Sequence, residues 1–369
     1  MERRKFIGTA GAGMAGILAT GSAPVFAQGA VAKGLPEIRW RMASSFPKSL
    51  DTIFGAAEVM ARRVAACTGG KFQIQVFAAG EIVPAFQVVD AVQNNTVQAA
   101  HTAPYYFWGK DPAFALDTAI PFSLNARQTN AWQLFGGGNE LFEEFYKAYN
   151  MKRVPCGNTG TQMGGWFRKE IKTPDDWKGL KFRIGGFAGK VIEKMGGVPQ
   201  LLPGGDIYPA LEKGTIDAAE WVGPYDDEKL GFNKIAKYYY SPGWWEGGPQ
   251  LVSYFNTTEW AKLPKEYQNI VEACCWEANT YMLAKYDAQN PAALKRLVGS
   301  GTLLRSFSKE VMVASYKAAL EVYKETMEKS PAFKKIYESM VKFRDDEIMW
   351  FGIAERGYDD FMHSIASIK

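Results

Sequence analysis

The fold of this chain is limited above all by a regular alternation of short strand-like and longer helix-like segments. We expect strands at residues 38–43, 71–77 and 97–102, separated by helices at 52–67 and 86–94. The second strand reads KFQIQVF, in which apolar and polar residues alternate as they do on a half-buried strand. This βαβαβ order predicts an α/β fold with a parallel sheet and helices on both of its faces.

The same pattern restarts after a helix expected at about 128–149, which predicts a second α/β lobe. With 369 residues, of which 47% are hydrophobic, the chain is long enough to bury the cores of two lobes. The second series contains strands at 151–155, 163–168, 180–184 and 215–222, a capped helical turn at 173–177, and helices at 188–195 and 207–213.

Beyond Pro264 the pattern is mostly helical, with helices expected at 265–286, 309–329 and 332–368. The last of these carries more large apolar residues than a solvated terminal helix needs. It therefore packs on its own lobes or forms an intermolecular surface, and the pattern alone favours neither. The apolar residues in question are Phe343, Ile348, Met349, Trp350, Phe351, Ile353, Phe361 and Met362.

The first residues read as an export signal. Arg3 and Arg4 precede a weakly apolar, glycine-rich run, and small residues suited to a signal peptidase lead up to Ala27. A twin arginine before such a run is typical of a Tat signal peptide, and the run is too short to span a bilayer. We therefore expect residues 1–27 to be a Tat signal and the mature protein to be periplasmic. The run Gly11–Gly16 fits G-x-G-x-x-G, but no strand precedes it, so we reject a dinucleotide site.

Composition excludes several classes of function. The chain has 43 Lys and Arg against 39 Asp and Glu, so it lacks the large excess of positive charge typical of proteins that bind nucleic acid or an anionic membrane. With two histidines and no G-x-S-x-G motif, a nucleophilic triad is poorly supported. The four cysteines match no zinc or iron–sulfur spacing, and we expect unpaired thiols. They are Cys67, Cys156, Cys274 and Cys275.

Arg183 is the candidate anion ligand. It stands at the end of an expected strand, before the glycine-rich run 185–189 that opens a helix. A guanidinium offers two parallel donors to a carboxylate, and the N–H groups at a helix start add positive potential. Gln162 lies in the polar bend 158–166, between two expected strands, and its side chain offers a neutral amide oxygen.

Two glutamates stand among aromatic and small residues, Glu220 in AAEWV and Glu246 in WWEGG. A carboxylate in such surroundings is protonated, buried against a cation, or solvated by a cavity. With Arg183 and a monocarboxylate ligand, the pair would leave a charge of −2, so a cation is expected. Two carboxylates, an amide oxygen and a backbone carbonyl favour a hard ion, Na⁺ or Ca²⁺, over zinc. The alternative is a glycosidase, with the glutamates as acid and nucleophile and tryptophans as sugar platforms.

Several motifs together resemble one known family, the periplasmic solute-binding proteins of TRAP transporters, over essentially the whole mature chain. The general family pattern matches Thr173–Arg183 (TPDDWKGLKFR) and Ala210–Ala218 (ALEKGTIDA). More specific matches are to the subgroup that binds 2-oxo acids together with sodium. These lie at Ser44–Lys48 (SSFPK), Tyr105–Asp111 (YYFWGKD), Asn158–Trp166, Gly204–Asp227 and Trp244–Gly248.

The resemblance implies a periplasmic-binding-protein fold of two α/β lobes that are joined by a hinge and close over a ligand cleft. Lobe I would comprise residues 28–155 and about 245–265, and lobe II residues 156–244 with part of 290–330. A helix at 265–288 would bridge the lobes.

The resemblance also implies a role for each candidate residue. In that family the arginine that matches Arg183 binds the substrate carboxylate. Residues that match Gln162, Glu220, the Trp221 carbonyl and Glu246 hold the metal, which in turn meets the 2-oxo and carboxylate oxygens of the substrate. Trp221 thus belongs to both the substrate and the metal site.

The aromatic loop with Tyr105 and Tyr106 would line the other wall of the site, although Phe107 stands where the family leads us to expect a tyrosine. The C-terminal helix at 332–369 would be exchanged between the subunits of a homodimer. Each of these assignments is an expectation from the family.

We therefore expect a receptor that captures a small 2-oxo monocarboxylate, pyruvate or a longer homologue, with Na⁺ and delivers it to membrane permease subunits. No covalent chemistry is expected. The first alternative is a receptor for lactate or another 2-hydroxy acid with Ca²⁺. The alternative from another class is a periplasmic glycoside hydrolase.

Overall fold

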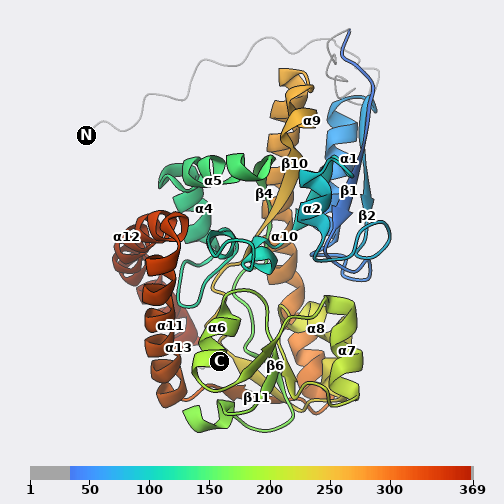
Figure 1. The fold of residues 1–369 in the computed structure, drawn as a ribbon. Coiled ribbons are helices and arrows are strands. Elements are labelled where there is room, and N and C mark those ends of the chain that lie inside the picture. The colour runs from blue at the N-terminus through green and yellow to red at the C-terminus, as the bar shows by residue number, and fades with distance from the viewer. Residues whose placement is uncertain (1–33, 367–369) are drawn as a thin grey trace, which may run out of the picture. The chain divides into compact units, whose positions relative to one another are not determined.

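The structure, a computed structural model, describes residues 34–366 and contains two β-sheets flanked by helices (Figure 1). All of its helices and strands belong to one compact unit, Pro36–Lys369. The signal expected at residues 1–27 lies outside the described residues. The α/β class of the fold agrees with the prediction from the strand and helix pattern.

The first sheet has the strand order β2-β1-β3-β10-β4. Its strands β1 (Ile38–Ser44), β2 (Phe72–Phe77) and β3 (Ala99–Thr102) are parallel, as the βαβαβ pattern predicts. The two connecting helices are α1 (Gly55–Cys67) and α2 (Val88–Gln93). Strand β10 (Gln250–Asn256) is antiparallel to both of its neighbours, β3 and β4 (Met151–Asn158).

The second sheet has the order β11-β9-β5-β8-β6-β7. Strand β6 (Lys181–Arg183) is parallel to β7 (Val198–Gln200) and to β8 (Ala218–Ala219). Strand β5 (Gly165–Phe167) is antiparallel to β8 and β9 (Tyr238–Ser241). The sheet ends with β11 (Leu303–Ser306), which is parallel to β9.

The parallel order predicted for the first three strands is confirmed, but β10 and β5 run antiparallel to their neighbours, and the chain path explains both. The strands of βαβ units end at one common edge of their sheet. The chain leaves the first sheet at the end of β4 to enter the second at β5, and it returns from β9 to β10. A strand that enters directly from such an edge must run against its neighbours. We call the two connecting segments between the sheets, residues 159–164 and 242–249, the crossings. The first contains Gln162 and the second contains Glu246.

The longest helix, α10 (Lys265–Gly299), continues well past the end expected at residue 286. It contains Pro291, which removes one backbone donor but does not end the helix here. Packing against α8 (Pro224–Leu230) supports this region, because Arg296 forms an ion pair with Glu228 at 2.6 Å. Towards its start, α10 packs on α1 and β4, so one helix contacts elements of both sheets.

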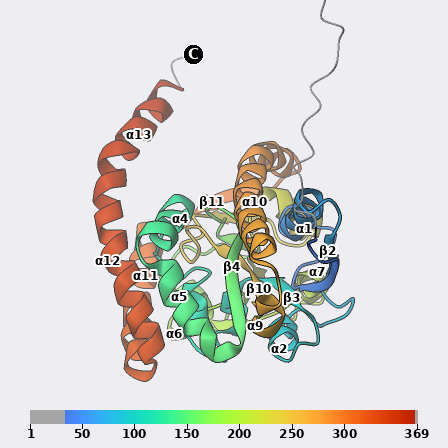
Figure 2. The ribbon, with the colours of Figure 1, turned by 90° about the horizontal axis from the view of Figure 1, so that it is seen from above.

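Two other expected helices are interrupted. The helix predicted at 128–149 is divided into α4 (Ala126–Phe135) and α5 (Gly138–Tyr146), because Gly137 adopts φ +86°, which breaks a helix. A 3₁₀ turn, Lys147–Tyr149, follows. The C-terminal helix is divided at Glu355 into α12 (Pro331–Ala354) and α13 (Arg356–Ile365). Figure 2 shows these two helices as a long rod at one side of the sheets.

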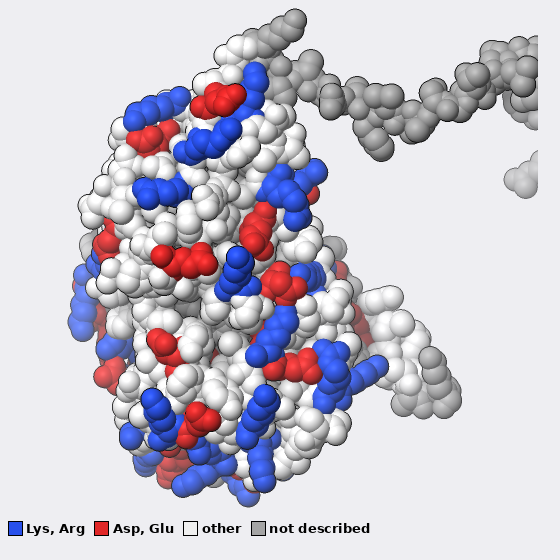
Figure 3. Space-filling model, turned by 90° about the vertical axis from the view of Figure 1, so that its right-hand side faces the viewer, with Lys and Arg blue, Asp and Glu red and all other residues white. Residues whose placement is uncertain are grey.

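The remaining helices are short, except for α11 (Lys309–Lys329), whose bounds match the prediction. Among residues 34–366, no helix has both the length and the apolar character needed to cross a bilayer. On the face drawn in Figure 3, basic and acidic side chains are interspersed and form no patch of one sign. The short helices are α3 (Ala113–Leu116), α6 (Ala188–Lys194), α7 (Gly204–Glu212), α9 (Thr257–Ala261) and 3₁₀ turns at Pro104–Phe107, Pro174–Trp177 and Phe232–Lys234.

Candidate functional site

Arg183, at the carboxyl end of β6, is buried with 1% of its surface exposed. Its Nη1 donates to the Glu220 side-chain Oε1 at 2.5 Å and to the Glu220 backbone oxygen at 2.9 Å. Its Nε donates to the Leu202 carbonyl at 3.1 Å. Burial alone would lower the pKa of Arg183, but the Glu220 charge raises it above its ordinary value. The guanidinium is thus fixed on two sides, and nearby Tyr106 also raises its pKa, while Nη2 is buried and makes no hydrogen bond in the described part of the chain.

Glu220 follows β8, the strand next to β6, and is fully buried. Its Oε1 accepts from Arg183 and from the backbone N–H of Gly185 at 2.7 Å. Burial raises the pKa of Glu220, and Arg183 and Gly185 oppose that shift. The second oxygen, Oε2, is buried and has no partner within residues 34–366.

Glu246 and Gln162 are brought together by the two crossings between the sheets, since the Gln162 N–H donates to the Glu246 carbonyl at 3.2 Å. The Gln162 Nε2 donates to Thr159 Oγ1 at 3.2 Å, which fixes the orientation of the amide and leaves Oε1 available to a ligand. Gln162 Oε1 and Glu246 Oε2 are buried without a partner in the described chain. Burial and then the negative charge of Glu220 raise the pKa of Glu246 well above its ordinary value.

Trp221 adjoins Glu220, and its ring lies 5.1 Å from the Arg183 guanidinium carbon. Two buried carboxylates in α8 hold this segment. Asp226 accepts from the Trp221 indole N–H at 3.4 Å, and Asp227 accepts from the backbone N–H of Val222 at 3.3 Å. These contacts fix the backbone at the position where the Trp221 carbonyl was expected to serve as a ligand.

Tyr105 and Tyr106 come from the first sheet, in the 3₁₀ turn after β3, and both are buried. Tyr105 lies directly against Gly185 and Gly186 of the second sheet. A Cβ on Gly186, where φ is +62°, would stand 1.8 Å from Tyr105 Cδ2, so any side chain there would displace the ring. Phe107 instead packs on Phe114, with ring centroids 6.2 Å apart.

The structure therefore brings all seven expected site residues to the junction of the two sheets. A cavity of about 10 Å³, room for about one water molecule, lies between the aromatic turn and the Gln162 segment. Arg183, Glu220 and Glu246 do not line it and are enclosed by the surrounding residues. The lining residues are Phe46, Ile53, Ala103, Tyr105, Tyr106, Thr159, Gln162, Trp221, Val222, Pro249 and Leu251.

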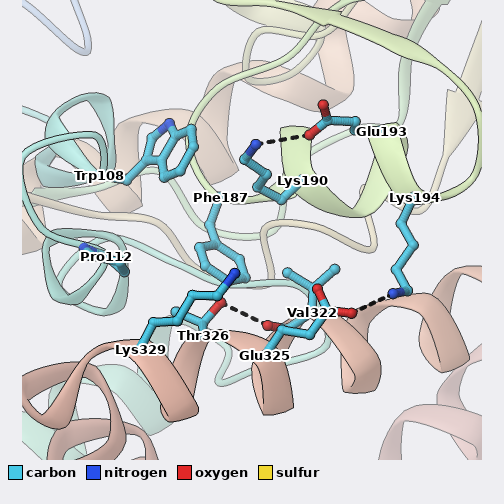
Figure 4. A pocket seen from close by; sticks show the side chains of 10 residues that line it. All are labelled: Trp108, Pro112, Phe187, Lys190, Glu193, Lys194, Val322, Glu325, Thr326 and Lys329. Atoms are coloured by element: carbon cyan, nitrogen blue, oxygen red, sulfur yellow. Dashed lines mark hydrogen bonds and ion pairs between the residues drawn. The ribbon is translucent and has the colours of Figure 1, made fainter.

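A larger groove of about 410 Å³ lies elsewhere, between Trp108, α6 and α11 (Figure 4). It contains none of the expected site residues. Its charges are largely paired with one another, as in the contacts of Lys190 with Glu193 at 2.9 Å and of Lys194 with Glu325 at 2.7 Å. The site residues are a better candidate for ligand binding, because their buried polar atoms are unpaired.

The unpaired atoms form a matched set of one guanidinium nitrogen and three oxygens. A buried polar atom without a partner is costly, so four at one junction indicate a ligand that completes them. Two carboxylates and an amide oxygen are suited to a hard cation, and the free nitrogen is suited to an anion. Within residues 34–366 no group of three or more His, Cys, Asp or Glu could hold a metal, so a bound ion would also need neutral oxygens.

Sequence reasoning missed Thr159, Asp226 and Asp227, which hold the candidate ligands in place. It assigned the N–H groups of the run 185–189 to an anion, whereas the Gly185 N–H donates to Glu220. Thr159 lies three residues from Gln162, a spacing that could have suggested the contact. The two aspartates stand in the GPYDD motif, but no pattern in the sequence shows that they turn inward.

The chain belongs to the family of bacterial extracellular solute-binding proteins, family 7 (DctP), whose model matches residues 43–330. It is 49% identical over 364 residues to the monocarboxylate 2-oxoacid-binding periplasmic protein of Nostoc sp. (strain PCC 7120), covering 99% of this chain and 100% of that relative.

Two solved structures make the class more specific. A TRAP transporter solute-binding protein from Bordetella bronchiseptica RB50 is 52% identical to this chain and superposes with a TM-score of 0.89. The match covers 90% of this chain and 99% of that one. The Bordetella structure is a mixed-occupancy dimer with copurified calcium and picolinate. A TRAP periplasmic solute-binding protein from Pseudoalteromonas atlantica T6c with bound sodium and pyruvate is 36% identical with a TM-score of 0.85, over 88% and 99%. The present chain is thus a TRAP transporter solute-binding protein.

Proposed function

We propose that this receptor binds a small 2-oxo monocarboxylate, such as pyruvate, together with a metal cation and delivers it to the membrane subunits of a TRAP transporter. The observation that carries the proposal is the set of four buried, unpaired atoms: Nη2 of Arg183 and one oxygen each of Gln162, Glu220 and Glu246. The 2-oxoacid-binding name of the Nostoc relative supports the same class of solute.

Arg183 would bind the solute carboxylate. Its Nη1 and Nε are already engaged, so the remaining nitrogen is held in a fixed direction and little side-chain entropy is lost on binding. The neighbouring Glu220 keeps the guanidinium charged despite its burial. Because Lys presents a rotating point charge in place of this rigid fork, we expect it to be a poor substitute here.

The cation would be held by the free oxygens of Gln162, Glu220 and Glu246 and by the Trp221 carbonyl. When bound, such an ion supplies positive charge to the 2-oxo and carboxylate oxygens of the solute, which lie side by side and suit a chelate. Tyr105 closes the site against Gly185 and Gly186 and excludes water, which strengthens every charge interaction inside. No bond of the solute is made or broken.

We propose Na⁺ as the ion, with Ca²⁺ as the alternative. The Pseudoalteromonas structure contains sodium with pyruvate, and the Bordetella structure contains calcium with picolinate. A 2-hydroxy acid such as lactate with Ca²⁺ is the alternative solute. The glycosidase alternative has less support, because Glu220 Oε1 is already engaged by Arg183 and by the backbone N–H of Gly185.

The proposal is tested with protein purified without denaturation. Native mass spectrometry identifies the copurified ion and solute, and calorimetry measures pyruvate affinity in Na⁺ and in Ca²⁺. Arg183→Lys keeps the charge beside Glu220 but loses the fork, so we expect affinity to fall about a hundredfold with little change in melting temperature. Arg63→Lys, on the exposed face of α1, is the control. Wild-type affinity in Arg183→Lys would overturn the role of the guanidinium.

We further propose a homodimer built through the C-terminal helices. Their first part is buried against the rest of the chain, for example at Phe333 and Met340, but their distal part exposes a cluster of large apolar side chains. An exposed apolar cluster of this size is typical of a protein interface. The exposed residues are Ile348 (59%), Met349 (64%), Trp350 (56%), Ile353 (74%), Tyr358 (64%), Phe361 (60%) and Met362 (41%).

Export through the Tat pathway also remains our proposal. It rests on the twin arginine at positions 3 and 4 and on the extracellular location that the family description states. The unpaired state of all four cysteines fits a protein that folds before export from a reducing compartment.

A further inference from the structure

The enclosed site can release its solute only if the two sheets separate. Arg183, Glu220 and Glu246 are each exposed by 2% or less, so no open path reaches them in this structure. Contacts that join the two sheets outside the site therefore contribute to how long a solute is held.

Asp51 makes such a contact. It lies in the loop between β1 and α1, on the first sheet, and its carboxylate accepts from Tyr225 Oη at 3.2 Å and from Lys229 Nζ, both on α8. Lys285 of α10 donates to the same carboxylate at 2.7 Å and to the Asp51 carbonyl at 2.9 Å. One carboxylate thus joins three donors from two helices.

Helix α8 is anchored to the second sheet, so the contact with Asp51 must break when the sheets separate. Asp227 of α8 accepts from the indole N–H of Trp166 on β5 at 3.0 Å and from Tyr239 Oη on β9 at 2.7 Å. The loop of Asp51, in contrast, continues from β1, whose following residue Ser45 is bonded to His101 of β3 at 3.0 Å. The carboxylate and its α8 donors therefore belong to different sheets.

The donors on α8 are well placed to hold the carboxylate. Lys229 Nζ lies 3.6 Å from the centroid of the Tyr225 ring, and its side chain is 28% exposed. Burial would raise the pKa of Asp51, but hydrogen bonds from Lys229 and Lys285 lower it to about 2, so the carboxylate is charged at neutral pH. The same helix begins three residues after Trp221, so it also positions one wall of the candidate site.

We propose that Asp51 is a latch residue that holds the two sheets together and prolongs the occupancy of the bound solute. The identity of the solute rests on the proposed function, but the latch itself does not. Its effect is expected to be moderate, because Asp51 is half exposed and single exposed ion pairs contribute little.

The test measures pyruvate release by stopped-flow tryptophan fluorescence for wild type, Asp51→Asn and Lys229→Met. We expect release from each variant to be about threefold to tenfold faster, and the double variant to be no faster than the stronger single one, since both remove the same contact. Glu277→Gln is the matched control, because it removes an equally exposed carboxylate that pairs with Arg63 at 2.8 Å between α1 and α10. Release unchanged in Asp51→Asn, or equally accelerated in Glu277→Gln, overturns the latch.

A second measurement separates failure of the latch from failure of the proposed function. If the wild type binds no 2-oxo acid, the proposed function is wrong, and X-ray scattering of the solute-free proteins at low salt decides the latch. Asp51→Asn should then show a larger radius of gyration than wild type and Glu277→Gln. Equal radii, with equal melting temperatures, refute it.

Discussion

Replacing Glu246 by Gln should make the solute-free protein more stable and, at the same time, unable to capture its solute. Glu246 is 2% exposed, and one of its oxygens has no partner in the described chain. Arg183 forms an ion pair with Glu220, whereas Glu246 forms none within residues 34–366, and burial and the Glu220 charge raise the pKa of Glu246 despite the opposing charge of Arg183. Gln has nearly the same shape, so the replacement removes the charge and keeps the packing.

The magnitude follows from the charges at the site. With both glutamates ionised, two carboxylates and one arginine would carry a net charge of −1 in a buried place, so the folded protein disfavours the charged form of Glu246. Relieving one unsatisfied buried charge is worth about 1–3 kcal/mol, so the free energy of unfolding of the solute-free protein should rise by about that amount. A cation about 4 Å from a carboxylate is attracted by about 4 kcal/mol at an effective dielectric constant of about 20, so loss of that charge should weaken cation binding by at least about a hundredfold.

The assay compares urea unfolding of chelator-treated protein with calorimetric titration of pyruvate at fixed Na⁺ or Ca²⁺. Glu220→Gln is the matched variant, because it also removes the ion pair with Arg183 and should lower stability as well as affinity. The two glutamine variants should thus change stability in opposite directions. A less stable Glu246→Gln protein, or one that binds pyruvate as wild type does, would refute the reasoning.

Two further predictions concern other parts of the chain. A protein that ends at Arg344 keeps the buried start of α12 but loses the exposed apolar residues that follow. Light scattering should find that this shortened protein is a monomer and that the full chain is a dimer. A dimer of the shortened protein would exclude the helix interface. Burial lowers the pKa of His101 from 6.5 to about 4. The unfolded chain therefore binds a proton at His101 below about pH 6.5, whereas the native chain binds it only near pH 4. The free energy of unfolding should fall as the pH falls through this window, by about 2 kcal/mol between pH 7 and pH 5. Urea unfolding at pH 7 and 5 checks this, and His101→Gln should reduce the difference.

Local patterns were sufficient to predict many elements of this fold. KFQIQVF alternates as a strand does, and β2 covers Phe72–Phe77. The helix at Lys309–Lys329 has Ser308 as its cap, and the cap and helical period together mark its limits. The pattern does not predict the strand β10, because all of its residues are buried and its polar residues, Gln250, Ser253 and Asn256, stand three positions apart and show no period of two.

The direction of β5 and β10 could not be predicted from local pattern, because it depends on which sheet a segment enters. The same crossings bring Gln162 and Glu246 together, although 84 positions separate them in the numbering of the chain. The sequence indicated that Arg183, Glu220 and Glu246 belong to one site. It treated the two glutamates as equivalent, whereas in the structure Arg183 forms an ion pair with Glu220, and Glu246 forms no ion pair within residues 34–366.

This asymmetry has a consequence for how the proposed ligands would bind. With both glutamates ionised, a monocarboxylate that entered alone would take the site from a charge of −1 to −2, in a place where water cannot screen it. A monovalent cation that entered first would make the site neutral and leave Arg183 Nη2 free for the anion. Each ligand should therefore strengthen the binding of the other by the same factor, since coupling between two bound species is reciprocal. On this reasoning the unpaired Glu246 makes solute capture depend on the cation, and the protein bears the cost as lower stability in the empty state.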